Sequence, residues 1–254
     1  MISNENTLIE DFTRYFRVEL VTSEQRAKEA YGVRYRVYCE EFEYEATDVF
    51  PDHLEKDEFD EQSLHCLIIH EERNIIAGCV RLVPVRSNKE NGLLPFEKFC
   101  QKSLDTELVN SFHLERSTEC EISRLAVDRA FRRRPGDAAT RFGEIESIDC
   151  DKQEQRTFSL IAVSAFLAAT ALTNLTHKTN VFAMMEPFLP RLLKRSGICF
   201  ERVGSDMDYH GIRAPYFIKT QAALDNMRTD LKVLYDWVYE QIERDYTLTS
   251  RPDF

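Results

Sequence analysis

Residues 157–176, TFSLIAVSAFLAATALTNLT, restrict the fold of this chain most strongly, because twenty consecutive residues carry no charge. That length would suit a membrane-spanning helix, which needs about 20 apolar residues. The segment also contains hydroxyl side chains, Asn174 and five alanines, and the chain has no second segment of this kind. A helix that is apolar all round is equally typical of the core of a globular protein. The sequence therefore favours a buried helix and no membrane span.

Short apolar and alternating runs around this helix predict strands. LHCLIIH and NIIAGCVRLVPV, residues 64–70 and 74–85, have the pattern of a hairpin joined by the turn EERN. Further strands are expected in the runs CEISRLAVD, NVFAMME, CFERVG and APYFIKT, at 120–128, 180–186, 199–204 and 214–220.

Helical patterns complete the order of elements. Ser23 is a candidate N-cap for a helix over 23–43, and a short helix is expected near 96–111. Further helices are expected at 187–197, ending at Gly197, and at 221–245. Strands followed by β-α-β crossovers predict an α/β fold with a mixed central sheet flanked by helices. We expect one domain over 1–254, with a core at about 15–220 and an extra C-terminal helix at 221–245.

The charge is strongly uneven along the chain. The net charge is -11, and residues 40–61 hold eleven Asp or Glu against one Lys. An acidic protein is a poor partner for nucleic acid, which requires a basic face. The acidic stretch is either a solvated loop or a site for a cationic group.

The cysteines indicate a reducing compartment. There are seven, scattered and odd in number, with no C-x-x-C pair, which predicts reduced thiols in a cytoplasmic protein. A catalytic cysteine is left open, although no nucleophile motif surrounds any of them. The N-terminal residues MISNENTLIEDFTRYF lack the apolar region of a secretory signal.

The stretch ECEISRLAVDRAFRRRPGDA, residues 119–138, runs from a strand into a basic turn that contains glycine. Such a turn can direct backbone N–H groups towards a phosphate. Arg133, Gly136 and Ala138 fit the pattern R-x-x-G-x-A. From spacing alone, a basic surface loop is the favoured explanation of these residues.

Taken with the order of elements, this loop resembles that of the GNAT acyltransferase superfamily. In that family a strand leads into an R/Q-x-x-G-x-G/A loop that holds the pyrophosphate of coenzyme A. The resemblance implies donor contacts from Leu125 and Val127 on the strand and from Arg133, Arg134 and Gly136 in the loop. The chain departs from the family pattern because about twenty residues separate the loop from the apolar helix.

Four ordered motifs also resemble the acyl-homoserine-lactone (autoinducer) synthases, a branch of the GNAT superfamily. VRYRVY contains Arg34 and Tyr38, DEFD contains Asp57 and Asp60, CVRL contains Arg81, and EISRLAV contains Glu121, Ser123 and Arg124. Two positions depart from that family: Tyr38 replaces the usual phenylalanine, and Tyr44 replaces tryptophan.

Over its whole length the chain is similar to the PEP-CTERM/exosortase-associated acyltransferases, relatives of the N-acyl amino acid synthases. The segments that carry this resemblance are RYRVYCEEFEYE, HLEKDEFDEQSLH, GCVRLV, LPFEK, SRLAV, FAMMEP and YHGIRAPYFI. It implies a GNAT fold and an acyltransferase activity, and leaves the substrate open.

Acyl transfer from a thioester to an amine needs a base, an oxyanion donor and fixed reactants. The resemblance implies that Glu121 is the base, with Ser123 and Arg124 beside it. The alternative for Glu121 is an exposed acid at the start of a strand or a partner of Arg124. Substrate contacts are expected from Arg34, Tyr38, Asp57, Asp60, Arg81 and Met184; charge pairing within a buried network is the other role open to the charged members. His65 and His210 are expected to be structural, and no metal site is indicated.

The donor is expected to be a substrate and not a permanently bound cofactor. Two basic runs, RAFRRR and RLLKR at 129–134 and 191–195, suit either an acidic acyl carrier protein or the phosphates of acyl-CoA. A solubilising basic surface would have the same composition. The apolar helix and the run VFAMME are candidates for lining an acyl pocket.

Three functions are consistent with the sequence. The first is N-acylation of an amino acid or a similar small amine from a fatty acyl thioester. The second is acyl-homoserine-lactone synthesis from S-adenosylmethionine, against which Tyr44 counts. The third is a non-catalytic acyl-thioester-binding protein, against which the intact motif residues count.

Overall fold

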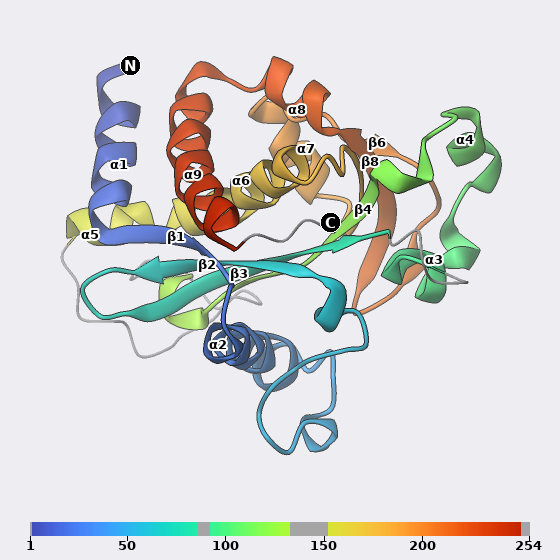
Figure 1. Cartoon of the computed structure of the whole chain (residues 1–254), viewed down its shortest axis with the longest axis horizontal. Coiled ribbons are helices and arrows are strands. Elements are labelled where there is room, and N and C mark those ends of the chain that lie inside the picture. The colour runs from blue at the N-terminus through green and yellow to red at the C-terminus, as the bar shows by residue number, and fades with distance from the viewer. Residues whose placement is uncertain (1, 86–91, 133–151, 250–254) are drawn as a thin grey trace.

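The computed structural model describes residues 2–85, 92–132 and 152–249, which form a mixed sheet with helices on both faces (Figure 1). The order of the strands is β1-β2-β3-β4-β5-β8-β6, and β7 pairs with β8. Only β4 and β5 are parallel; the other ladders in the described residues are antiparallel. This arrangement confirms the predicted fold class. The strands are β1 (Phe16–Leu20), β2 (Leu64–His70), β3 (Ile75–Pro84), β4 (Glu119–Val127), β5 (Asn180–Met185), β6 (Glu201–Arg202), β7 (Met207–Asp208) and β8 (Ile212–Lys219).

The predicted strands agree with the structure, but the N-terminal segment was missed. Helix α1 (Ile2–Tyr15) leads directly into β1, which forms the edge of the sheet beside β2. Three side chains of β1 are buried, and the strand alternates between buried and half-buried positions. Five residues alternating over so short a stretch are a weak sequence signal, and pairing with β2 supplies the missing stabilisation.

The apolar segment is a buried helix, as the sequence predicts. Helix α6 (Ser159–Leu175) packs on β2, β3 and β4 and is covered by α9 (Thr229–Leu248) on its other side. It has apolar neighbours on both sides, which explains why no face of it is charged. Gly78 of β3 permits the close approach, since a Cβ atom there would lie 3.1 Å from Cγ2 of Ile161. No helix among the described residues is long and apolar enough to cross a membrane.

The opposite face of the sheet is covered by α2 (Glu24–Tyr35) (Figure 1). Ser23 caps this helix as predicted, because its Oγ accepts a hydrogen bond from the N–H of Arg26 at 3.2 Å. Ala30 and Val33 pack into a cluster that includes Leu67 and Cys79 of the sheet. The helix predicted over 23–43 changes to a π-helical turn at Arg36–Glu41.

Two other predicted helices are interrupted. The segment near 96–111 contains α3 (Pro95–Phe99), a 3-10 turn and α4 (Thr106–Ser111), which Asp105 caps. The C-terminal helix is divided into α8 (Thr220–Asn226) and α9 by Met227, whose backbone is extended.

The division between α8 and α9 is fixed from outside the helix. The N–H of Arg228 donates to the carbonyl of Ser196, which follows α7 (Leu189–Arg195). A Cβ atom on Gly197 would lie 1.8 Å from the carbonyl oxygen of Asn226, so only glycine fits this contact. Gly197 has a φ of +86°, which agrees with its predicted place at the end of α7. Helical periodicity cannot reveal such a contact, because it depends on a distant segment. One further short helix, α5 (Lys152–Thr157), precedes α6.

Candidate active site

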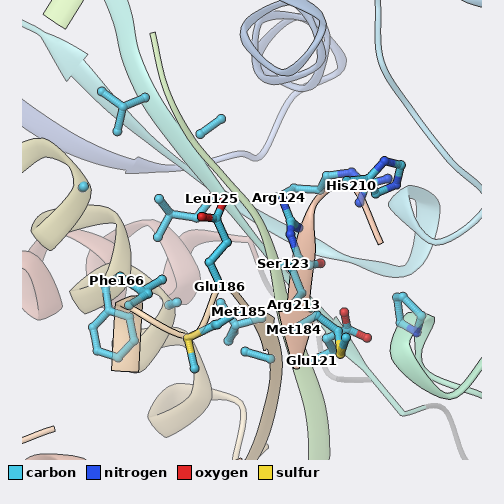
Figure 2. Close-up of a pocket in the computed structure, with 18 of the residues that line it drawn as sticks. Glu121, Ser123, Arg124, Leu125, Phe166, Met184, Met185, Glu186, His210 and Arg213 are labelled. Atoms are coloured by element: carbon cyan, nitrogen blue, oxygen red, sulfur yellow. The ribbon is translucent and has the colours of Figure 1, made fainter. Parts of the chain in front are cut away.

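A cavity of about 440 Å³ lies between β4 and β5 (Figure 2). The two strands pair through Glu119–Glu121 and Asn180–Phe182, and the ladder ends there in the described chain. Beyond that point residues 121–127 and 183–186 line the cavity. An unpaired strand edge offers backbone N–H and C=O groups to an extended ligand. The separation of β4 from β5 therefore suits a substrate with an amide-containing arm.

Glu121 lies where the two strands separate, among apolar side chains. In the ladders it is opposite Val83 on one side and Phe182 on the other, so all three point to the same face of the sheet. The side chain is only 3% exposed, and its Oε2 accepts a hydrogen bond of 2.7 Å from the N–H of Phe96. The alternative of an exposed acid at the start of a strand is therefore wrong.

Burial raises the pKa of Glu121 to about 7, although the N–H of Phe96 and the charges of Arg81 and Arg124 act in the opposite direction. No hydrogen bond joins Glu121 to either arginine among the residues described. A carboxyl group that changes charge near neutral pH is suited to accept a proton during a reaction.

Six side chains form a charged network beside Glu121. Arg34 contacts Glu55 and binds Asp60 at 2.7 Å. Arg81 binds Asp57 at 2.6 Å and Asp60 at 2.9 Å. Arg124 lies 3.1 Å from both Glu55 and Asp57. The motif residues Arg34, Asp57, Asp60, Arg81 and Arg124 thus lie together in the structure, and of these five only Arg124 lines the cavity. We use the name charged network for Arg34, Glu55, Asp57, Asp60, Arg81 and Arg124.

The network assigns different positions to residues that the sequence grouped as substrate-binding. Arg34 and Arg81 are completely buried, and Asp60 is nearly so. The neighbouring arginines hold the pKa of Asp60 well below its usual range against the effect of burial. Arg34, Asp60 and Arg81 therefore lie behind the cavity wall, where they can position other groups but not contact a substrate directly. This corrects the expected substrate contacts of these three residues.

Glu55 was missed by the sequence analysis although it holds two arginines of the network together. It lies in the acidic stretch 40–61, where composition gives no reason to select one carboxylate from eleven. Its partners Arg34 and Arg124 are 21 and 69 residues away along the chain. Only the folded structure identifies the partner.

Arg124 has an unusual backbone conformation, with a φ of +52°. The register between β3 and β4 shifts at this place, between Cys79 and Arg81, which marks a β-bulge. The hydroxyl of Tyr38 donates to the carbonyl of Leu125 at 2.9 Å, and the Arg124 guanidinium lies 5.8 Å from the centre of the Tyr38 ring. Burial raises the pKa of Tyr38 to about 12, so it remains a hydrogen-bond donor at neutral pH. A bulge changes the direction of the N–H groups along a strand, and residues 121–127 of β4 line the cavity.

Met184 and Met185 line different parts of the cavity, because neighbouring residues of a strand point to opposite faces. Met184 packs in the same cluster as Phe96 and Phe182, near Glu121. Met185 packs with Leu189 and Phe200. Figure 2 shows Phe166 and Met185 on the opposite side of β4 from Arg124 and His210. We call Phe166, Met185, Leu189 and Phe200 the apolar chamber.

A group of polar residues at the other end of the cavity was not identified from the sequence. His210, expected to be structural, lines the cavity, and its Nε2 lies 3.4 Å from Glu45. Arg213 lies over the ring of Tyr44, 5.5 Å from its centre. We call Tyr44, Glu45, His210 and Arg213 the polar end. His65, by contrast, is buried beside Asp60 at 3.6 Å, and burial lowers its pKa to about 4, which fits the expected structural role.

Residues 33–141 match the family model described as the acetyltransferase (GNAT) domain. This part of the chain is therefore similar to the GNAT acetyltransferase domain. Curated protein sequences give no match. The acetyltransferase match and the separation of β4 from β5 together make this chain an acyltransferase, and the cavity is its candidate active site.

Solved structures with the same fold cover most of the chain. The ternary complex of TofI with an inhibitor and MTA has a TM-score of 0.57 at 18% identity, over 85% of this chain and 99% of that one. BjaI, a CoA-dependent acyl-homoserine lactone synthase with SAM and isopentyl-CoA, gives 0.58 at 15%, over 88% and 89%. FeeM, an N-acyl amino acid synthase from uncultured soil microbes, gives 0.52 at 11%, over 84% and 94%. At these identities the similarity establishes the fold.

Within the GNAT domain, Leu125 and Val127 line the cavity along the open edge of β4. They are therefore placed where an acyl-thioester arm would pass. The other expected donor contacts, Arg133, Arg134 and Gly136, lie outside the described residues.

Proposed function

We propose that this acyltransferase moves a fatty acyl group from a thioester to the amine of an amino acid or a similar small acceptor. The observation that carries the proposal is the position of Glu121. Its carboxyl group, with a pKa of about 7, lies on the wall of a cavity that has an apolar chamber and a polar end. The chamber suits an acyl chain, and the polar end suits an acceptor.

The reaction needs a neutral amine, and an α-amino group, with a pKa of about 8 or higher, is largely protonated at neutral pH. Glu121 would take the amine proton, directly or through a water, as the nitrogen attacks the thioester carbonyl. The C–N bond forms, the C–S bond breaks, and the thiolate leaves. The proton held by Glu121 can then return to the departing thiolate, which restores the carboxylate.

The remaining motif residues would support this step. Arg124 and Asp57 would hold the bulge of β4 in place, so that its N–H groups can stabilise the oxyanion. Ser123 accepts a hydrogen bond of 3.1 Å from Arg81 and lies next to Glu121 on the same face, where it would orient the reactants. The charged network would thus hold the residues of the site in place, and Glu121 would transfer the proton.

The donor is proposed to be acyl-CoA or an acyl carrier protein. The first turn of α7 borders the cavity through Phe188 and Leu189. Arg191 and Lys194 on the same helix are exposed, and Leu192 between them is 47% exposed. A basic surface with an apolar centre, beside the acyl chamber, is complementary to an acidic carrier protein. We extend the proposal to a cytoplasmic enzyme of the PEP-CTERM/exosortase-associated type on the sequence motifs alone.

Synthesis of an acyl-homoserine lactone would require S-adenosylmethionine, whose sulfonium needs a site for a cation. Aromatic rings are common sites for such cations. Tyr44 already stacks on Phe42, with ring centres 5.3 Å apart, and interacts with the Arg213 cation. This arrangement supports an acceptor without a second positive charge.

The test is a reaction of the purified protein with acyl-CoA or acyl carrier protein thioesters of several chain lengths. A mixture of amino acids or S-adenosylmethionine would be the acceptor. We expect thiol release that depends on the amino acids and an N-acyl amino acid in the mass spectrum. Methylthioadenosine with an acyl-homoserine lactone would identify the other reaction. Thioester binding without thiol release under any condition would indicate a non-catalytic protein.

A further inference from the structure

Arg213 differs from the other arginines around the cavity in having no carboxylate partner. Arg124 binds Glu55 and Asp57, and Arg132 contacts Glu41. In the part of the chain that the structure describes, no Asp or Glu oxygen lies within 4.0 Å of Arg213, and its buried Nε has no hydrogen-bond partner. The guanidinium is half-buried and lines the cavity. A partly desolvated cation of this kind is stabilised when an anion binds beside it.

Arg213 points to the same face of the sheet as Glu121. In the ladder between β5 and β8, Phe182 is opposite Phe217 and Met184 is opposite Pro215. Alternate residues of a strand share a face, so the row Phe217, Pro215, Arg213 continues from the row that holds Glu121. Glu121, Ser123 and Arg213 all line the cavity, and Figure 2 labels them in the same part of the view. A small molecule in the polar end can therefore reach towards both the guanidinium and the carboxyl group.

The surroundings of Arg213 favour a single negative charge. Burial is the main cause of the lowered pKa of His210, and the charges of Arg213 and Arg124 also lower it. The imidazole is therefore neutral, and Arg213 supplies the positive charge that attracts an anion. Glu45 and Glu55 also line the cavity. These acids disfavour a pyrophosphate, which would bring several negative charges close to them. A planar carboxylate matches the geometry of one guanidinium.

We infer that Arg213 binds the carboxylate of the acceptor, so that the acyltransferase selects an amino acid over an amine that lacks a carboxylate. The inference rests on the proposed acyl transfer and names the substrate class for the same site. A zwitterionic amino acid would be held at one end by Arg213, and its amine would be directed towards Glu121 and the thioester. Tyr44 keeps the guanidinium in place through the contact with its ring. Arg81 and Arg124 are already paired with Asp57.

The test compares matched acceptors with and without a carboxylate. Leucine and 3-methylbutylamine form one pair, and phenylalanine and phenethylamine form another. The wild-type protein should prefer the amino acid by roughly 10- to 100-fold in kcat/KM, the usual contribution of a hydrogen bond to a charged group. Arg213→Met should reduce this preference towards one, mainly through KM. Arg213→Lys should restore part of it, because the charge remains but the planar fork is lost.

Arg202→Met is the matched control, because Arg202 is exposed, pairs with Asp206 and lies on neighbouring β6. It should keep the wild-type preference. An equal loss for amino acids and amines in Arg213→Met would overturn the inference and assign Arg213 to the donor or to stability. A wild-type protein that uses both acceptors equally well would overturn it too.

Binding measurements separate this inference from the proposed function. If no acceptor reacts at all, the proposed function fails, and calorimetric titration of leucine against 3-methylbutylamine still tests Arg213. Tighter binding of leucine that is lost in Arg213→Met supports the carboxylate site. Equal binding of the two compounds, or none of either, contradicts it.

Discussion

The charged network and Glu121 both contain buried carboxyl groups, but the pKa values of these groups are shifted in opposite directions. The carboxylates Glu55, Asp57 and Asp60 are largely buried, yet their pKa values are lowered because arginines lie within hydrogen-bond distance. Glu121 is also buried, and burial raises its pKa, because the N–H of Phe96 and the charges of Arg81 and Arg124 lower it by less. Pairing, and not burial alone, decides whether a carboxyl group remains charged. The network is therefore expected to govern stability, and Glu121 to govern proton transfer.

The largest expected effect comes from removing the proton acceptor. Glu121→Gln should reduce acyl transfer by roughly 10²–10⁴-fold, the usual range for general acid–base catalysis. The glutamine oxygen can still accept the N–H of Phe96, so thioester binding and folding should be retained. Single-turnover rates and melting temperatures measured on the same preparation give both quantities.

Partial recovery of the rate at high pH is expected in Glu121→Gln, since more of the amine is then neutral. A variant with the full wild-type rate would remove Glu121 from proton transfer. A variant that is inactive because it does not fold would place Glu121 with the network.

Breaking the network should act on stability first. Arg34→Met removes one of the two arginines that bind each of the buried carboxylates Glu55 and Asp60, and should lower the free energy of unfolding by about 3–5 kcal/mol. Arg26→Met is the control on the same helix, because Arg26 pairs with Glu19 and Glu29 near the surface and should cost only about 0–1 kcal/mol. Urea unfolding curves measure both. Similar small losses in the two variants would show that the network does not hold the site together.

The contributions of Glu121 and of the network carboxylates to the stability of the fold should change with pH in opposite directions. Glu121 has a folded pKa of about 7, above the ordinary value of 4.5, so the folded state binds the proton more tightly. Its contribution to stability is complete below about pH 4.5 and is lost as the pH rises through about 7. The network carboxylates have lowered pKa values, so their contribution is present above their ordinary values and is lost as the pH falls through the folded ones.

Unfolding free energies of the wild-type protein and Glu121→Gln across pH 4–8 isolate the first effect. The difference should favour the variant by roughly 3 kcal/mol at pH 8 and should vanish at low pH. A constant difference over this range would mean that Glu121 does not titrate near neutrality. The activity of the wild-type protein should rise with pH through about 7, while the acid limb of unfolding should be the same in both proteins.

Replacing exposed charges should have the smallest effect on activity, and only through association with the carrier protein. Replacing Arg191 and Lys194 of α7 with glutamate should lower kcat/KM for an acyl carrier protein roughly tenfold, with an effect that weakens in salt. The same variant should keep its kcat/KM for acyl-CoA. Arg202→Glu supplies a charge-reversal control away from α7, to be compared with the single variants Arg191→Glu and Lys194→Glu. Equal losses with both donors would argue that α7 acts on the acyl chamber and not on a carrier protein.

The sequence alone determined the secondary structure around the site and most members of the network. Period-2 and apolar runs specified β2, β4 and β5, and twenty uncharged residues specified a buried helix. The four ordered motifs also grouped the charged residues of the site: Arg34, Asp57, Asp60, Arg81, Glu121 and Arg124. These features depend on local patterns or on motif order, which a single chain displays directly.

Only the tertiary structure decided which charges are paired and which are not. Glu55 joins Arg124 across 69 residues, and Arg213 reaches the cavity from β8 without a carboxylate partner among the described residues. Burial raises the pKa of Glu121, and its neighbours Val83, Phe96 and Phe182 come from three separate segments. Electrostatic energies depend on distances and on exclusion of water, and both are set by the packing of distant segments. The sequence thus provides the charged groups, and the fold decides which of them hold the structure and which are left free to react.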